Sequence, residues 1–474
     1  MKNPSIKLLF VFSSLLWTTF SFAGTDCEIY NWPESLKASS RYAVSAAGKD
    51  VLVIDVNPGG CSVTPDPAIN MGVKNADEPN VALFGADGTV EVKVKFLTGA
   101  PEKVEVRPLG KEYKYSLSGD ELTLKLKTYD RVSVEADGNI DAPLFIFVNP
   151  IEAAVLEAAK KDPDTKVYTA GKVYSSDCFK FYSKKIYIQG GAVLDGFFLH
   201  KSATFDSEIN GCGIIDSRAW DKNTAFDIHN AENLVVRNIT VLNRKMWSFR
   251  LVFCHNFIVD NVKVVAACPY NDNWDENDGI HPVASTDGLI TRCFAYSWDD
   301  AYNFTSSFFN YIGEVHDIDV EDCIGWNVHP GNAFEVSWST KKDIYNLKFK
   351  NLYAIHSGTK RPYARSGLSI HHAGPAKVHD LKYENVWVED PYEYGLAVYL
   401  MKEGQLYNIS YKNVHILKTP PLGCILQGSS SEHQVHDITF TNLTIAGKKI
   451  KSVDDPGFRS EIRPAKNYKN ITFK

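Results

Sequence analysis

Three acidic side chains lie in two short segments whose spacing suits acid–base cleavage of a glycosidic bond. Asp278 stands in Asn277-Asp278-Gly279, and the pair Asp299-Asp300 begins 21 residues after it. Neighbouring carboxylates repel each other, so one of them tends to hold its proton near neutral pH. Glycosidic cleavage uses such an unequal pair, because one acid protonates the leaving oxygen while the other deprotonates a water. A calcium site and a solvated acidic corner are the alternatives for the same residues.

A repeat in the sequence predicts how these acids meet. Similar segments recur at intervals of 23 to 34 residues, with Asn, or Asp or Cys in its place, at positions 238, 261, 293, 322, 351, 385, 413 and 442. Each unit holds only two or three short strands, so it buries its apolar face by stacking about 4.8 Å from the next unit. Asn suits the corner, since it tolerates the left-handed conformation. The repeat therefore predicts a parallel β-helix in which Asp278 lies roughly 5–8 Å from Asp299 or Asp300.

The chain is predicted to contain a leader and two all-β domains. Residues 1–23 have the basic start, short apolar run and small-residue end of a cleaved signal peptide, which predicts a secreted or periplasmic protein. In residues 24–148 apolar and polar residues alternate along several short segments, a period typical of a β-sandwich. A short helix is predicted at 151–161. We assign residues 149–474 to a right-handed parallel β-helix that carries the acids.

Composition excludes several classes of partner. The 474 residues carry a formal net charge of −6 without a basic stripe, so nucleic acid is not an expected partner. No segment after the leader has the length and hydropathy of a membrane span. Cys27 and Cys61 are a candidate disulfide, whereas Cys293 and Cys323 occupy matching places in the repeat and are expected to stack as free thiols. The chemistry needs no metal or organic cofactor, and we expect a monomer.

Four segments of the chain form a set with a known counterpart. They are LFIFVNPIE at 144–152, NDGIHP at 277–282, SWDDAYNF at 297–304 and GNAFEVSWSTKKDIYNLKFKNL at 331–352. The set resembles glycoside hydrolase family 49, the dextranases and isopullulanases, which is related to the polygalacturonases of family 28. The resemblance implies a β-sandwich joined to a β-helix and hydrolysis with inversion. It also implies that Asp299 is the general acid and that Asp278 and Asp300 position and deprotonate the water.

Two motifs of the polygalacturonases are absent from this chain, and the second absence indicates a neutral substrate. The Gly-His-Gly of those enzymes is absent after Asp299-Asp300, and His329 is the nearest substitute. Their Arg-Ile-Lys, which grips a uronate carboxylate, is absent too, and the comparable stretch runs from Arg365 to His371. An acidic sugar needs a cation at its carboxylate. We therefore expect a neutral α-glucan, dextran with its α-1,6 links first, although Arg365 or a neighbouring cation would serve an anionic glycan.

Aromatic and polar side chains near the acids are candidates for sugar binding. Flat rings suit the apolar faces of sugars, and the outward position of Glu335 after the inward Phe334 suits a sugar hydroxyl. The residues predicted to contact the substrate are Trp274, Trp298, Tyr302, Trp326, His329, Glu335, Trp338, Arg365 and His371. About half of the tryptophans in this region are expected to pack within the helix wall or under loops instead.

Three other functions compete with hydrolysis of a neutral glucan. One is a polygalacturonase-like hydrolase of an anionic glycan, and another is a polysaccharide lyase on the same fold. A lyase needs calcium or a Lys or Arg base, and the sequence shows no such cluster. The third is a carbohydrate-binding β-helix without catalysis. A binder has no reason to align three carboxylates on adjacent coils, so the acids favour an enzyme.

Overall fold

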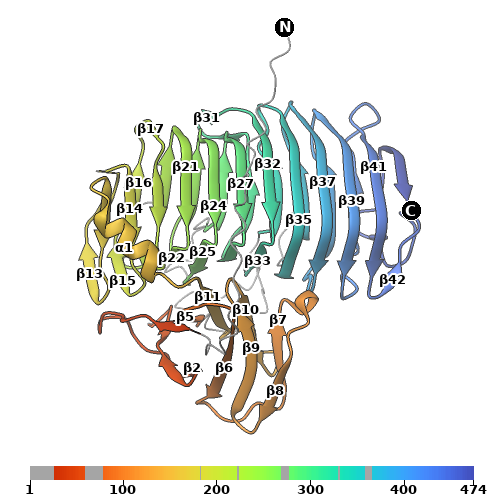
Figure 1. Ribbon diagram of the computed structural model, residues 1–474. Coiled ribbons are helices and arrows are strands. Elements are labelled where there is room, and N and C mark those ends of the chain that lie inside the picture. Colours follow the sequence, from red (N-terminus) through yellow and green to blue (C-terminus); the bar gives the residue numbers. More distant parts are fainter. Residues whose placement is uncertain are drawn as a thin grey trace, which may run out of the picture.

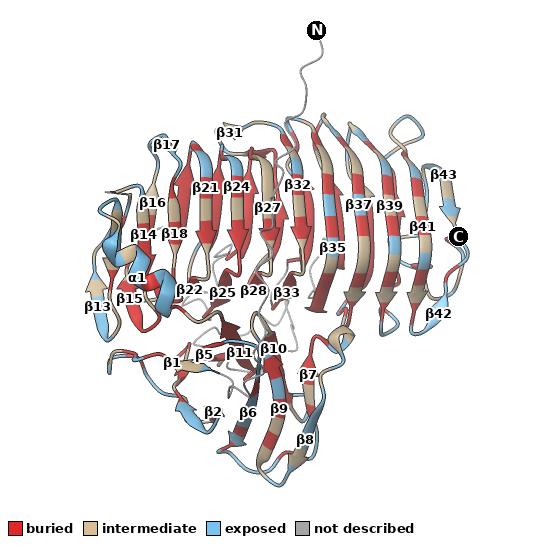
Figure 2. Ribbon diagram, viewed as in Figure 1, coloured by how far each residue is buried: buried red, intermediate tan, exposed pale blue. Residues whose placement is uncertain are grey.

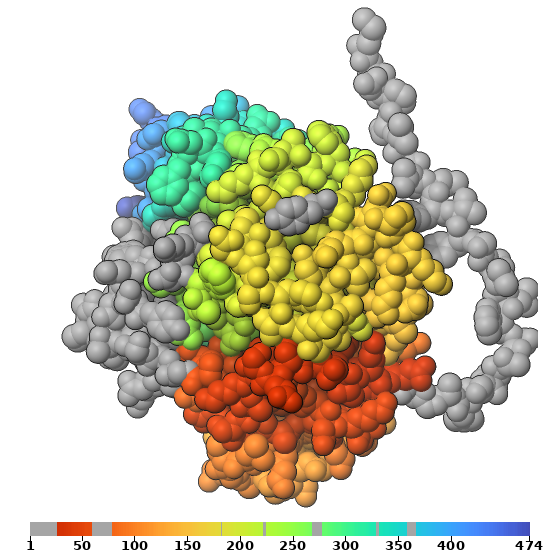
Figure 3. Space-filling view, turned by 90° about the vertical axis from the view of Figure 1, so that its left-hand side faces the viewer, coloured from red at the N-terminus to blue at the C-terminus, as the bar shows by residue number. Residues whose placement is uncertain are grey.

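The computed structural model describes residues 26–58, 78–181, 183–220, 224–267, 277–328, 331–357 and 366–474. A long stack of short parallel strands forms most of the molecule, and a smaller, mostly antiparallel part lies against one side of it (Figure 1). Seen from the end of the stack, the first described part of the chain, in red, lies directly beneath the first coils, in yellow (Figure 3). Within the described residues no helix is both long and apolar enough to cross a membrane.

The N-terminal part is a sandwich of two sheets. One contains β1 (Cys27–Ile29), β4 (Val53–Asp55), β5 (Asn80–Ala86), β7 (Val104–Arg107), β10 (Arg131–Ala136) and β11 (Leu144–Asn149). The other contains β2 (Tyr42–Ala46), β3 (Lys49–Val51), β6 (Thr89–Phe96), β8 (Tyr115–Ser118) and β9 (Glu121–Lys127). A short 3₁₀ turn, η1 (Leu109–Lys111), follows β7. Exposed and buried residues alternate strictly along β6, so one face of this strand packs into the core between the sheets, as its period of two predicts.

A helix and one buried carboxylate join the sandwich to the stack. The helix α1 (Ala153–Lys161) follows β11 and confirms the prediction for 151–161. The Glu152 side chain just before it accepts hydrogen bonds from the backbone N–H groups of Gly190 at 2.7 Å and Cys212 at 2.8 Å. It also accepts one from the Tyr187 hydroxyl at 3.0 Å. The junction is thereby tied to two early coils.

The stack is a parallel β-helix, as the repeat predicts. Its larger sheet contains β12 (Thr165–Tyr168), β13 (Lys172–Ser175), β14 (Lys185–Ile188), β15 (Ala192–Asp195), β17 (Thr204–Phe205), β18 (Glu208–Asn210), β19 (Ile214–Asp216), β21 (Ala231–Arg237), β22 (Thr240–Asn243), β24 (His255–Asp260), β25 (Lys263–Ala266), β27 (Thr286–Thr291), β28 (Phe294–Ser297), β32 (Val315–Glu321), β33 (Ile324–Asn327), β35 (Ile344–His356), β37 (Lys377–Val388), β39 (Gln405–Ile416), β41 (Val435–Ile445), β42 (Lys448–Lys449) and β43 (Tyr468–Phe473). Each coil pairs in parallel with the next, except for the antiparallel β42 near the end of the chain.

A second sheet of the β-helix, here called the site sheet, carries the candidate active site on its outer face. It contains β16 (Phe198–His200), β20 (Phe226–His229), β23 (Phe249–Val252), β26 (Ile280–Val283), β29 (Tyr302–Phe304), β34 (Phe334–Trp338), β36 (Ser366–His372), β38 (Tyr394–Leu400) and β40 (Ile425–Gln427). A small hairpin of β30 (Ser307–Phe308) and β31 (Tyr311–Ile312) follows β29. The inward side chains of this sheet and of the larger sheet fill one continuous core.

Left-handed residues form the corners of the coils, with one correction to the predicted positions. Asn413 and Asn442 have φ near +54° and +57°, and the Asn442 amide donates to Asn413 at 3.0 Å. In the coil assigned to Cys293, the left-handed residue is Arg292, with φ of 52°. Arg292 tolerates this position because it forms a two-pronged ion pair with Asp260 at 2.6 and 2.8 Å. The prediction was therefore one residue out of register in that coil.

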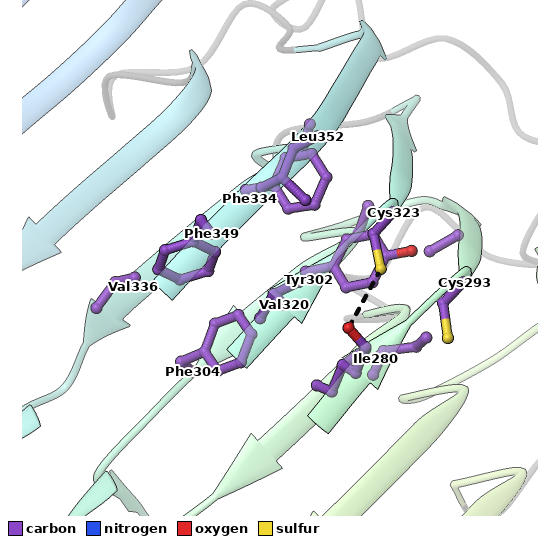
Figure 4. Packing of buried hydrophobic residues seen from close by; sticks show 14 of the residues in the cluster. Ile280, Cys293, Tyr302, Phe304, Val320, Cys323, Phe334, Val336, Phe349 and Leu352 are labelled. Carbon is purple, nitrogen blue, oxygen red and sulfur yellow. Dashed lines mark hydrogen bonds between the residues drawn. The ribbon is translucent and has the colours of Figure 1, made fainter. Parts of the chain in front are cut away.

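The cysteines are free thiols wherever the structure describes them. Cys293 and Cys323 are buried on neighbouring coils, which confirms the stacked thiols (Figure 4). Cys27, the described half of the predicted Cys27–Cys61 bridge, is a free thiol whose sulfur lies 3.8 Å from the Ala46 carbonyl. Cys61 itself lies outside the described residues.

The sandwich is fixed to the β-helix by a dry aromatic contact. Strands β10 and β11 are buried almost throughout (Figure 2). The Phe145 ring of β11 lies 4.9 Å from Phe294, 5.1 Å from Tyr296 and 5.6 Å from Trp326, measured between ring centroids. These rings exclude water from the interface and strengthen the electrostatic interactions beside it.

A buried cluster of charges, here called the interface ion cluster, lies beside this contact. Arg107 of the sandwich donates to Glu135 at 3.0 Å and to Glu389 of the β-helix at 2.8 Å. His356 lies 3.1 Å from Glu135 and 3.3 Å from Asp390. Burial raises the pKa of Glu389 to about 7 against the opposing charge of Arg107. For His356, the carboxylates of Glu135 and Asp390 outweigh the effect of burial and raise its pKa above 6.5.

The interface ion cluster predicts that stability decreases as the pH rises towards neutral. Glu389 keeps its proton up to about pH 7 in the fold but loses it near 4.5 when unfolded. The folded state therefore binds more protons between these values, and His356 acts in the same direction above pH 6.5. We expect the free energy of unfolding to fall by about 3 kcal/mol across this window. Urea unfolding at several pH values measures it, and Glu389→Gln should give a clearly flatter profile.

Candidate active site

Strand register brings Asp278 and Asp300 to the same place on neighbouring coils. Ile280 of β26 pairs with Tyr302 of β29. Two residues before each of these lie Asp278 and Asp300. The Gly279 N–H donates to the Asp300 carbonyl at 2.8 Å, so the same parallel pairing extends to the residues just before the two strands. The two acids therefore stand side by side at the amino ends of their strands, as the repeat predicts.

Asp300 is held by amide donors from two sides. Its Oδ1 accepts the Asn332 N–H at 2.7 Å and the Asn332 side-chain amide at 2.9 Å, both from the next coil. Its Oδ2 accepts the Asn303 amide at 2.7 Å. Hydrogen bonds from three N–H groups stabilise the ionised form of a carboxyl group. Asp300 thus has the surroundings of a carboxylate base.

Asp278 has a different partner. Its Oδ2 lies 2.6 Å from Nδ1 of His281, and both side chains are buried. Burial, and next the charge of Arg250, lower the pKa of His281 well below its ordinary value of 6.5. The His281 ring also stacks on Trp247, with 4.2 Å between ring centroids. Two neighbouring carboxyl groups therefore have unequal environments, one with amide donors and one with an imidazole.

Asp299 is the least buried of the three acids. Its side chain is half-buried, whereas Asp278 and Asp300 are only 5% and 6% exposed. Its Oδ1 accepts the N–H of Asp300 at 2.9 Å, and its own N–H donates to the Asn277 carbonyl at 3.2 Å. Partial exposure suits a group that hands a proton to a substrate oxygen and regains it from solvent.

Gly331 packs closely against the peptide bond between Asp299 and Asp300. A Cβ atom at this position would lie 2.3 Å from the carbonyl carbon of Asp299 and 2.5 Å from the backbone nitrogen of Asp300. The absence of a side chain at Gly331 lets the next coil approach this peptide closely. Gly331 therefore helps to set the direction of both carboxyl groups.

A row of polar side chains, of which the sequence analysis predicted only Glu335, runs across the outer face of the site sheet. Strand register aligns Asp227, Arg250 and His281 on successive coils, followed by Asn303 and Glu335. Arg250 forms a two-pronged ion pair with Asp227 at 2.7 and 2.8 Å. The period of two, counted from the inward residues Ile280 and Tyr302, was the signal that would have found this row.

Three predicted sugar-binding residues face elsewhere. Tyr302 is fully buried in the core, stacks on Phe334 at 4.8 Å and donates to the Ile324 carbonyl. Its position alternates with the outward Asn303, so this prediction is corrected. Trp298 and Trp326 are 4% and 2% exposed and belong to the aromatic core between the β-helix and the sandwich. Docking of the sandwich covers both rings, so neither is available to a sugar.

The remaining predicted contacts have three different outcomes. Glu335 and His371 face outward from β34 and β36, but both are buried and 3.2 Å apart. Trp338 lies at the end of β34, has a φ of 127° and is 37% exposed. It therefore keeps a position suited to a sugar ring. The predicted residues that lie outside the described part of the chain are Trp274, His329 and Arg365.

Among the described residues, no group of three or more His, Cys, Asp or Glu side chains is arranged to hold a metal ion. The site consists of the buried acids Asp278 and Asp300, the His281 imidazole, and the amides of Asn303 and Asn332. Such an arrangement has the parts for moving protons: an ionised acceptor, a half-exposed acid and a buried imidazole.

Comparison with known proteins finds solved structures of similar fold. No family model and no curated protein matches the sequence. Dex49A from Penicillium minioluteum has a TM-score of 0.53 at 13% identity, with 94% of this chain and 96% of that chain covered. A polygalacturonase from Erwinia carotovora ssp. carotovora has a TM-score of 0.44 at 14% identity, covering 68% and 93%. The catalytic domain of a GH87 α-1,3-glucanase has 0.43 at 13%, covering 94% and 88%. The chain thus shares its fold over nearly its whole length with Dex49A.

Proposed function

We propose that the protein is a glycoside hydrolase that cleaves a polysaccharide with inversion, most specifically the α-1,6 links of a dextran-like glucan. The observation that carries the proposal is the placement of Asp278 and Asp300 side by side on neighbouring coils, with the half-buried Asp299 beside them. The fold shared with Dex49A and the motif resemblance to the dextranase family support it. Residues 1–23 would direct the protein out of the cytoplasm.

The three acids divide the work of hydrolysis. Asp299 gives its proton to the glycosidic oxygen as the bond to the anomeric carbon breaks. Asp300 takes a proton from the attacking water, and Asp278 helps to position that water. A single displacement by water on the opposite face of the sugar inverts the anomeric centre. Exchange with solvent then returns the proton to Asp299 and removes it from Asp300.

A neutral glycan suits the charges on the outer face of the site sheet. An anionic sugar needs a cation that is available to its carboxylate. Arg250, the cation beside His281, has its guanidinium held by both oxygens of Asp227 at 2.7 and 2.8 Å. This pairing leaves Arg250 poorly placed to bind a uronate. Binding would have to break a buried ion pair, which is costly.

The test is a panel of purified glycans with product analysis. We expect reducing-sugar release from dextran to exceed release from polygalacturonate by at least about tenfold. Proton NMR of the fresh products should show the β-anomer first, since inversion at an α-link gives a β-sugar. Asp299→Asn, purified in the same way, controls for contaminating enzymes. Faster release from polygalacturonate would replace the neutral substrate with an anionic one, and no release from any glycan would reject hydrolysis.

A further inference from the structure

Three side chains connect Asp278 to Asp300 by an unbroken line of hydrogen bonds. Asp278 Oδ2 lies 2.6 Å from His281 Nδ1, and His281 Nε2 lies 2.8 Å from the Thr305 hydroxyl. Thr305 lies 3.0 Å from Asn303 Oδ1, and the Asn303 amide reaches Asp300 Oδ2 at 2.7 Å. None of the five residues is more than 6% exposed. Such a buried line has a definite direction of donors and acceptors.

The order of donors and acceptors along this line is determined at Asp300. The Ser366 N–H donates to Asn332 Oδ1 at 2.9 Å, so the other end of that amide, its NH₂ group, faces Asp300. Asp300 accepts from this group and from the Asn332 N–H, as an ionised carboxylate does. The Asn303 end that faces Asp300 is therefore also its NH₂ group. Its carbonyl oxygen, Oδ1, then faces Thr305 and can only accept.

Thr305 determines which nitrogen of the His281 imidazole carries the proton. Its single hydroxyl proton is donated to Asn303 Oδ1. The hydroxyl oxygen must then accept from His281, so Nε2 of His281 carries a proton. In a neutral imidazole the other nitrogen, Nδ1, then has a lone pair, and this lone pair faces Asp278 at 2.6 Å. The tautomer follows from the hydrogen-bond network.

We infer that the line through Asn303, Thr305 and His281 places a proton on Asp278 while leaving Asp300 ionised. The carboxylic acid of Asp278 donates to Nδ1 of His281 through the 2.6 Å contact. His281 and Thr305 are thus positioning residues that act through the acids. They make two adjacent carboxyl groups unequal, whereas two ionised carboxylates on neighbouring coils would repel each other.

The charged surroundings of His281 are consistent with a neutral ring. From β23, Arg250 faces it, already paired with Asp227 of β20. On the next coils, Asp300 is connected to His281 through Asn303 and Thr305, and Glu335 pairs with Asn303 in the strand register. The nearby Trp247 ring covers one face of the imidazole and excludes water there. Burial and the Arg250 charge both oppose an imidazolium, which keeps the pKa of His281 well below 6.5.

This inference rests on the proposed function for its consequence in catalysis. One oxygen of the protonated Asp278 remains free of a proton and can accept a hydrogen bond from the attacking water. The water gives its other proton to Asp300, its oxygen bonds to the anomeric carbon, and the Asp299 proton goes to the leaving oxygen. The line therefore assigns the base as Asp300 and leaves Asp278 to orient the water.

The kinetic test compares two substitutions of Thr305. Thr305→Val keeps the shape but removes the hydroxyl, so the Nε2 proton loses its acceptor and Asp278 can ionise. An ionised neighbour raises the pKa of the base, and we expect the acidic limb of the kcat/KM profile to move up by about one pH unit. Thr305→Ser keeps the hydroxyl and should keep the limb in the wild-type position. Superimposed profiles for wild type and Thr305→Val, or equal shifts in both variants, would overturn the inference.

Nitrogen NMR tests the proton positions without relying on activity. The chain has 13 histidines, so His281 is assigned in uniformly histidine-labelled protein by comparison with His281→Gln. We expect a protonated Nε2 and a hydrogen-bonded, unprotonated Nδ1 at neutral pH in the wild type, with the tautomer reversed in Thr305→Val. A doubly protonated ring or an Nδ1–H tautomer in the wild type would refute the placement. If no glycan is cleaved, the proposed function fails, while these spectra still decide where the proton lies.

Discussion

Replacing Asp299 with Asn is expected to lower kcat about 10²- to 10⁴-fold on dextran, with little change in KM or stability. Asn has nearly the same shape but cannot donate a proton to the glycosidic oxygen, and general acid catalysis contributes about this factor. The side chain is half-buried, and its Oδ1 accepts a local hydrogen bond from the Asp300 N–H at 2.9 Å. An amide oxygen can accept the same bond. Initial rates of reducing-sugar release and a thermal melt measure the two properties.

A substrate with a good leaving group separates the role of Asp299 from that of the base. Fluoride departs from a glycosyl fluoride with little need of protonation, so Asp299→Asn should lose much less rate on this substrate than on dextran. Asp300→Asn should lose rate on both, because each needs an activated water. Asp287→Asn is a matched control, since Asp287 lies at an exposed left-handed corner where other coils carry Asn. Normal dextran hydrolysis by Asp299→Asn would show that another residue is the acid.

Replacing Arg107 with Met is expected to destabilise the protein by about 3–5 kcal/mol. Arg107 is 3% exposed and bonds Glu135 and Glu389, which are 2% and 0% exposed. Met fills much of the same volume but removes the cation that bonds both carboxyl groups, so that Glu389 loses its ion pair and Glu135 keeps only the one with His356. Removal of one partner from a buried ion cluster costs more than the cluster contributes, because the remaining charges stay desolvated. Urea unfolding, followed by tryptophan fluorescence, measures the loss.

The matched control for Arg107→Met lies in the same sandwich. Lys93 and Glu121 form an ion pair at 3.0 Å, with side chains 46% and 43% exposed. Lys93→Met should cost far less than Arg107→Met, since exposed ion pairs contribute little to stability. Equal losses from the two variants would mean that the interface ion cluster is not the origin of the effect.

Alternation and repetition in the sequence predicted the architecture well. The strands of the sandwich, the helix after β11 and the stacked coils follow from periods that depend only on local geometry. The side-by-side placement of Asp278 and Asp300 follows from the same periodicity, because equal positions in successive coils become neighbours. The exact corner was missed at Arg292, where an ion pair with Asp260 permits a residue that usually avoids this conformation.

Tertiary structure alone decided which side chains reach the outer face. The aromatic residues Trp326 and Tyr302 suit a sugar platform and a packed core equally well as residue types. Trp326 is buried because Phe145, from a strand far away in the chain, packs on it. Tyr302 is buried because its side chain points inward from its strand, whereas that of the next residue points outward. The connection between His281 and Thr305 likewise depends on two coils meeting in register. The sequence by itself determined the local periods and the kinds of chemical group. Which groups touch was decided by packing between distant segments, because burial depends on what covers a residue and not on the residue itself.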